Sequence, residues 1–175
     1  ARALAVVGLA GLADPGVKIP ADAVAVHGIS NERVAAEGEP ADRVADALAE
    51  ALVSYWRTGV PVVAYHAAFD LTLLSAALRR HRLPSLADRL GGTAPAPVID
   101  PYTIDRRADR YRRGKRNLEA VCAEYGIVLE AAHNASADAL AAARLAAAGI
   151  DPTRRAGQLD LEAFCRLSTL LAPPR

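Results

Sequence analysis

Two aspartates and one histidine stand where their side chains could share one chemical task. Asp70 directly follows the largely apolar stretch VPVVAYHAAF, and His133 and Asp138 form a His-x-Ala-x-x-Asp arrangement. Carboxylate oxygens are the ligands that hard divalent cations such as Mg²⁺ prefer, and histidine titrates near neutral pH. The three side chains therefore match a metal-dependent hydrolytic site in which the imidazole takes a proton from water.

Each of these residues has a plainer explanation when it is taken alone. Asp70 comes at the start of an expected helix, where an aspartate is favoured as the N-cap. His133 could be a solvated loop histidine, and Asp138 a surface residue of a helix. The set is more informative than its members, because hydrolysis of a phosphodiester by two metal ions needs carboxylates with a base nearby.

The composition indicates one ordinary folded domain. The chain has 175 residues, of which 52% are hydrophobic and 23% charged, and its net charge is +1. Such a charge gives no overall attraction to a polyanion, so a nucleic-acid site would have to be local. Cys122 and Cys165 lack the spacing of a metal or redox pair and are expected to be core thiols. With no leader and no apolar run of about 18 residues, we expect a soluble, cytoplasmic protein.

Apolar periodicity predicts a single α/β domain with a mixed sheet. In the helix expected over residues 40–57, the apolar face should consist of Val44, Leu48, Leu52 and Tyr55. Residues 20–30 are expected to be irregular. Strands are predicted at 3–10, 12–19, 60–65 and 98–99, and helices at 31–36, 40–57, 69–82, 101–110, 117–125, 135–148 and 159–171. Asp70 would then follow a central strand, at the edge of the sheet where ligands collect in α/β folds.

Four segments, in this order, resemble one known family. They are Val26-His27-Gly28-Ile29-Ser30, His66-Ala67-Ala68-Phe69-Asp70, the helix that leads into Tyr125-Gly126-Ile127, and His133 to Asp138. Together they resemble the DEDDh branch of the DnaQ-like 3′ to 5′ exonucleases, typified by the proofreading epsilon subunit of bacterial DNA polymerase III. The similarity extends over residues 2–148.

The resemblance implies a fold, an activity and a site. The fold would be a ribonuclease H-like mixed sheet flanked by helices, with residues 1–150 as the exonuclease domain and 151–175 as a C-terminal helical extension. Such an enzyme hydrolyses phosphodiester bonds at the 3′ end of DNA or RNA with two Mg²⁺ or Mn²⁺ ions, and a polymerase subunit could be its partner. Asp70 and Asp138 would be metal ligands, and His133 would be the general base. The residues expected near the terminal nucleotide are His27, Gly28, Ile29, His66 and Phe69.

The sequence departs from the family pattern at two places. Position 66 is His where Asn is usual, and no Asp-x-Glu pair lies on an early strand. Either residues 2–10 are the family's second strand, which places the pair before Ala1, or Gly8 and Ala10 stand in its place. We therefore expect the sequence to be a fragment or to lack a native segment, and this chain to hydrolyse weakly or not at all. The alternative is an inactive exonuclease-like module that binds single-stranded nucleic acid or a polymerase partner.

A basic run occupies residues 106–116. It contains seven lysines and arginines, with Asp109 as the acid among them. A charged run of this kind is either a solvated face or an edge that contacts phosphates. On the second interpretation Arg112 and Arg113 bind the substrate backbone.

Overall fold

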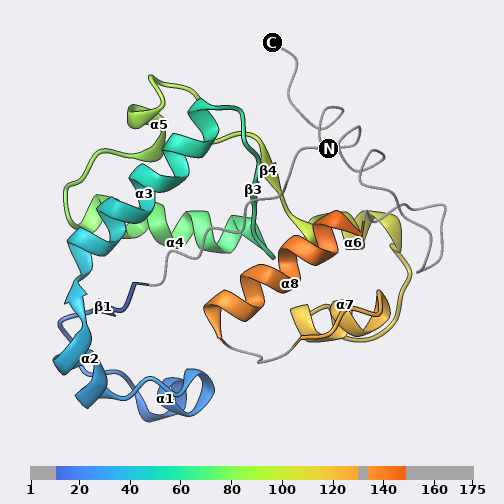
Figure 1. Ribbon diagram of the computed structural model, residues 1–175, viewed down its shortest axis with the longest axis horizontal. Coiled ribbons are helices and arrows are strands. Elements are labelled where there is room, and N and C mark those ends of the chain that lie inside the picture. Colours follow the sequence, from blue (N-terminus) through green and yellow to red (C-terminus); the bar gives the residue numbers. More distant parts are fainter. Residues whose placement is uncertain (1–10, 130–133, 149–175) are drawn as a thin grey trace.

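The computed structural model describes residues 11–129 and 134–148, in which short strands alternate with helices (Figure 1). The strands are β1 (Ala13–Asp14), β2 (Glu39–Pro40), β3 (Val62–Val63) and β4 (Val98–Ile99). The helices are α1 (Ala21–His27), α2 (Asn31–Glu37), α3 (Ala41–Arg57), α4 (Ala67–Arg80), α5 (Leu86–Arg89), α6 (Pro101–Ala108), α7 (Leu118–Glu124) and α8 (Ala135–Ala147). This order confirms the predicted α/β class.

The pair β3 and β4 is parallel and lies at the centre of the fold. Val62 pairs with Val98 and Val63 with Ile99, and the Ala64 amide continues the ladder to the Ile99 carbonyl at 3.1 Å. Parallel strands need a crossover between them, and α4 and α5 supply it. The carboxyl ends of both strands therefore meet at one edge of the sheet.

Helices cover both faces of this sheet (Figure 1). On one face α3, α4 and α5 form the larger core, against which Val62 and Val98 pack. On the other face Val63 packs against the buried Ile99, beside α6 and α8, while α7 and α8 form a third cluster. Alternate strand residues thus face opposite layers, as the pleat of a strand requires. The buried residues of the larger core are Ala45, Ala49, Val53, Trp56, Leu74, Leu78 and Leu86.

The segment over residues 20–30 is not wholly irregular, so that prediction is wrong. Ala21–His27 is the helix α1, and Gly28 ends it in the left-handed conformation with φ 72°. Alanine favours a helix, and glycine adopts this C-terminal conformation without the strain of a Cβ. The next helix, α2, begins as expected, because the Ser30 side chain accepts a hydrogen bond from the Arg33 amide at 3.2 Å.

Helix α3 has its expected position, but its buried face is rotated by one residue. Ala45, Ala49, Val53 and Trp56 are buried, whereas Leu48, expected on the inner face, is 36% exposed. The Trp56 indole nitrogen donates a hydrogen bond to the Pro97 carbonyl at 3.1 Å, next to β4. Burying the large indole with its polar atom satisfied fixes the rotation of the helix, and the small alanines let α3 approach its neighbours closely.

The other expected helices, near residues 69–82, 101–110, 117–125 and 135–148, and the strands at 60–65 and 98–99 are confirmed with shorter or shifted bounds. Both sheets in the described part of the chain are parallel rather than mixed. Helix α5 was not expected, although Ser85 and Asp88 form a capping box at its start. The strand predicted at 3–10, the helix at 159–171 and Cys165 lie outside the described residues. No helix within those residues is long and apolar enough to span a membrane.

The two leucines of α4 that differ most in burial test this packing. Leu78 is 1% exposed in the larger core, whereas Leu73 is 61% exposed on the same helix. We expect Leu78→Ala to lower the free energy of unfolding by about 2–5 kcal/mol, because it leaves a cavity. Leu73→Ala, the matched control, should change it by no more than about 0.5 kcal/mol. Urea denaturation measures both values, and equal effects would contradict the arrangement.

Candidate functional site

Asp70 stands at the exposed end of the buried face of α4. It is the fourth residue of the helix, and the N-cap is His66, which has the left-handed φ of 63°. The N-cap interpretation of Asp70 is therefore wrong. Ala67, Leu74 and Leu78 are buried and lie three, four and eight residues from Asp70, which places all of them on one side of the helix. The carboxylate thus extends the inward face to the point where the helix meets the sheet edge.

Asp138 occupies the equivalent position on α8. It is also the fourth residue of its helix, whose N-cap Asn134 accepts hydrogen bonds from the Ser136 and Ala137 amides at 3.1 and 3.2 Å. The residues three, four and seven positions further on are all buried, so Asp138 too extends the buried face of its helix. The pKa of the Cys122 thiol on α7 is raised, mainly by burial and secondly by the negative charge of Asp138. Asp138 therefore lies on the inner side of α8, which packs against α7.

Asp100 joins the two strand ends and was not singled out in the sequence. It follows β4 and caps α6, where its Oδ1 accepts the Tyr102 amide at 3.1 Å. The same oxygen accepts the His66 amide at 2.8 Å, and Oδ2 accepts the Thr103 hydroxyl at 2.8 Å. The signal that could have found it is an aspartate followed by Pro101 after a short apolar run, since proline favours the first position of a helix.

The charge of Asp70 is disfavoured where it stands. The pKa of the Asp70 carboxyl is raised above its ordinary value, mainly because the side chain is partly buried. Of the nearby charges, that of His66 lowers this pKa and that of Asp100 raises it. A raised carboxyl pKa means that the anion lacks solvent or a cation. Neither Asp70 nor Asp138 forms a salt bridge with any residue in the described ranges.

Three aromatic rings gather beside Asp70. The His66 ring lies 4.6 Å from the Tyr102 ring centroid and is stacked on Phe69 at 6.2 Å with an interplanar angle of 11°. Phe69 is 61% exposed, so most of this residue is in contact with solvent. The structure thus brings together His66, Phe69 and Asp70, which the sequence pattern had grouped.

The segment His27 to Ile29 is not part of this group. Its residues close α1, where the Ile29 amide donates to the His27 Nδ1 at 3.0 Å. Figure 1 shows α1 beside α2 at the lower end of the molecule, apart from the edge formed by β3 and β4. A contact of these residues with a terminal nucleotide therefore stays a prediction.

The described residues provide carboxylates of the right chemistry for a metal but not a complete set. Oxygen donors suit Mg²⁺ or Mn²⁺, and Asp70 and Asp138 offer them. Within residues 11–129 and 134–148, no three His, Cys, Asp or Glu side chains are grouped so as to hold an ion. His133, the expected base, lies outside these ranges, as does the one Asp-x-Glu triplet of the sequence, Asp160-Leu161-Glu162.

The basic run divides into an inner and an outer part. Asp105 is fully buried and accepts hydrogen bonds from Arg112 at 2.8 Å and Arg116 at 2.6 Å. The Tyr125 hydroxyl donates a hydrogen bond to Asp105 at 3.3 Å. The pKa of Tyr125 is raised to about 12, mainly by burial and secondly by the negative charge of Asp105. Arg112 is thus engaged inside the protein, and phosphate binding stays a prediction for the exposed Arg113.

Comparison with known proteins gives one match. A model of the exonuclease family RNase_T matches residues 11–146, which is most of the chain and includes Asp70, His133 and Asp138. The chain belongs to this exonuclease family. No curated protein matches it, and no solved structure does.

Membership of the exonuclease family supports a ribonuclease H-like α/β fold, a nuclease function and binding to nucleic acid. Members generally use divalent metals, for which Asp70 and Asp138 offer oxygen donors. The match is to the exonuclease family as a whole and does not favour the epsilon subunit over other members. The direction of cleavage and the roles of Asp70, His133 and Asp138 therefore belong to the proposal below.

Because the charge of Asp70 is unfavourable in the folded protein, removing it should make the protein more stable. Because burial raises its pKa above the ordinary value of 3.8, folding loses stability as pH rises from that value through the folded pKa. In EDTA at pH 7, Asp70→Asn should therefore raise the free energy of unfolding, by no more than about 0.5 kcal/mol for an exposed group.

Chemical denaturation from pH 3 to pH 7 measures this effect. The variant and the wild type should converge below pH 3.8, where both side chains are neutral. A variant that is less stable at pH 7 would show that the anion is stabilised by the fold, contrary to the argument.

Proposed function

We propose that the protein is a 3′ to 5′ exonuclease in which Asp70 and Asp138 hold divalent ions and His133 is the general base. The observation that carries the proposal is the matching position of the two acids. Each is the fourth residue of its helix and extends a buried face. Helix α4 shares the larger core with Val62 and Val98 of the β3–β4 sheet, and α8 contacts β3. The family match spans all three residues.

The two carboxylates would supply the negative charge that a divalent ion requires. Bound Mg²⁺ or Mn²⁺ polarises a phosphate oxygen and makes water more acidic. Partial burial makes the ionised form of Asp70 unfavourable in the free protein, so a nearby cation would favour its ionisation. His133, directly before the N-cap of α8 in the sequence, would accept the proton of the attacking water.

Cleavage at an end of the strand agrees with the exposed ring of Phe69. Phe69 lies one residue before Asp70 and is 61% exposed. An unpaired terminal base could stack on it and so place its phosphate beside the carboxylate. Aromatic stacking of this kind is tolerant of sequence, since every base has a flat face.

The proposal is tested on the gene product at its full natural length, with residues numbered as here. A single-stranded oligonucleotide labelled at its 5′ end should be shortened stepwise from the 3′ end with Mg²⁺ or Mn²⁺, and not in EDTA. Asp70→Asn, Asp138→Asn and His133→Ala should each reduce the rate by about 100-fold or more, because each removes several kcal/mol of transition-state stabilisation.

Asp42→Asn is the matched control, since Asp42 is another exposed aspartate in the first turn of a helix. It should leave the rate unchanged. Shortening from the 5′ end, or activity that survives Asp138→Asn, would refute the assignment. Metal-independent binding with no hydrolysis would favour the inactive, strand-binding alternative.

A further inference from the structure

The outer face of α6 is a basic surface that the proposed catalytic residues do not use. Thr103, Arg106 and Arg107 are spaced three and four residues apart, so they share one side of α6, and Arg110 follows in the turn after the helix. All four are exposed, and together they line a hollow of about 510 Å³. No acidic side chain is among the residues that line it.

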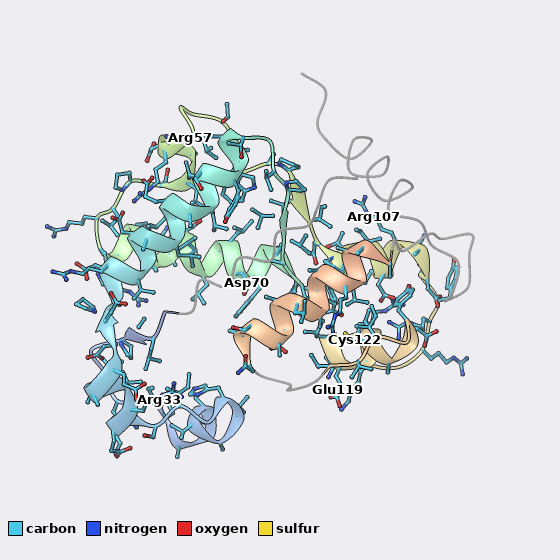
Figure 2. The ribbon with its side chains drawn as sticks, viewed as in Figure 1. Arg33, Arg57, Asp70, Arg107, Glu119 and Cys122 are labelled. Atoms are coloured by element: carbon cyan, nitrogen blue, oxygen red, sulfur yellow. The ribbon has the colours of Figure 1, made fainter. Side chains whose placement is uncertain are left out.

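These arginines differ from those that stabilise the fold. Arg112 and Arg116 are turned inward to Asp105, and their side chains are only 12% and 16% exposed. Within the described ranges, Arg106, Arg107 and Arg110 form no salt bridge with a carboxylate. Figure 2 shows Arg107 projecting away from α6. Their positive charge is therefore open to an external anion.

A continuous series of flat groups joins this surface to Asp70. Phe69 stacks on His66, His66 lies against Tyr102, and the Arg106 guanidinium is 5.6 Å from the centre of the Tyr102 ring. Asp100 holds this series together, since it binds both the His66 amide and the start of α6. Stacking surfaces beside a row of cations are the two features by which proteins bind a single strand without reading its sequence.

We infer that the outer face of α6 is the binding track for single-stranded nucleic acid 5′ of the terminal nucleotide. Arg106, Arg107 and Arg110 bind the backbone phosphates. The unpaired end of the strand passes along Tyr102 and His66 and stacks on Phe69, next to Asp70. The inference rests on the proposed function for the polarity of the strand, but the track itself is a binding property and can be measured without hydrolysis.

The arginines are tested by the salt dependence of binding. Fluorescence anisotropy with a labelled oligothymidine in EDTA gives the affinity at several salt concentrations. Each phosphate contact to a single strand contributes about 0.7 to the slope of log affinity against log salt, so Arg106→Ala, Arg107→Ala and Arg110→Ala combined should reduce it by about 2.

The matched control removes the same charge elsewhere. Arg43, Arg79 and Arg80 are exposed arginines of α3 and α4, outside the hollow on α6. Their combined replacement by alanine should leave the slope nearly unchanged. Equal losses from both triple variants, or no loss from the α6 variant, would overturn the track.

The aromatic end of the track is tested at Phe69, which is exposed enough to be replaced without loss of the fold. Phe69→Leu keeps an apolar side chain but removes the ring, and should weaken binding of the oligothymidine about tenfold. Phe69→Trp should restore it. Equal affinities of the leucine and tryptophan variants would show that no base stacks there.

The failure of this inference can be told apart from failure of the proposed function. Normal hydrolysis, with no effect of the α6 and Phe69 variants on binding, rejects the track alone. Absence of hydrolysis, with the expected loss of salt slope and of stacking, rejects the exonuclease activity and leaves the track in place.

Discussion

The parallel pairing of β3 with β4 is the contact on which the candidate site depends. Because the two strands run in the same direction, their carboxyl ends lie at one edge, and the segments that follow them begin there. Asp100 makes this arrangement specific, since one carboxylate binds the amide of His66 after β3 and caps α6 after β4. The start of α4, with Asp70, is thereby held beside the start of α6, while α8 packs against the same sheet from its other face.

The aspartates of this region differ in whether an arginine compensates their charge. Asp105 is fully buried, and two inward arginines compensate its charge within the fold. A buried carboxylate without such partners would be strongly destabilising. Asp70 and Asp138 lie at the margin of the core and form no salt bridge within the described ranges, as the proposed metal site requires. The same division separates the inward arginines from those on α6, which remain open to an anion.

Much of the fold was predictable because apolar periodicity fixes most of the helices and the strands at residues 60–65 and 98–99. The rotation of α3 was not, because its two candidate faces are both apolar and only the contact of Trp56 with Pro97 chooses between them. Asp70 and Asp138 were proposed as metal ligands from residue type, spacing and family resemblance, and that role stays a prediction. The role of Asp100 was not predictable because its partner His66 is 34 residues away in the chain. The inward position of Arg112 was not predictable because a charged sequence does not reveal that Asp105, seven residues before it, is fully buried.

The central claim is that Asp70 and Asp138 hold ions at one shared site. The test is the affinity for Mn²⁺, measured from the decrease of the electron paramagnetic resonance signal of the free ion. The full-length gene product is compared with its Asp70→Asn, Asp138→Asn and double variants. Residues that share a site are not additive, so each single substitution should weaken binding at least about tenfold, and the double variant should be little worse than either. Unchanged Mn²⁺ affinity in either single variant, or losses that add, would contradict the account.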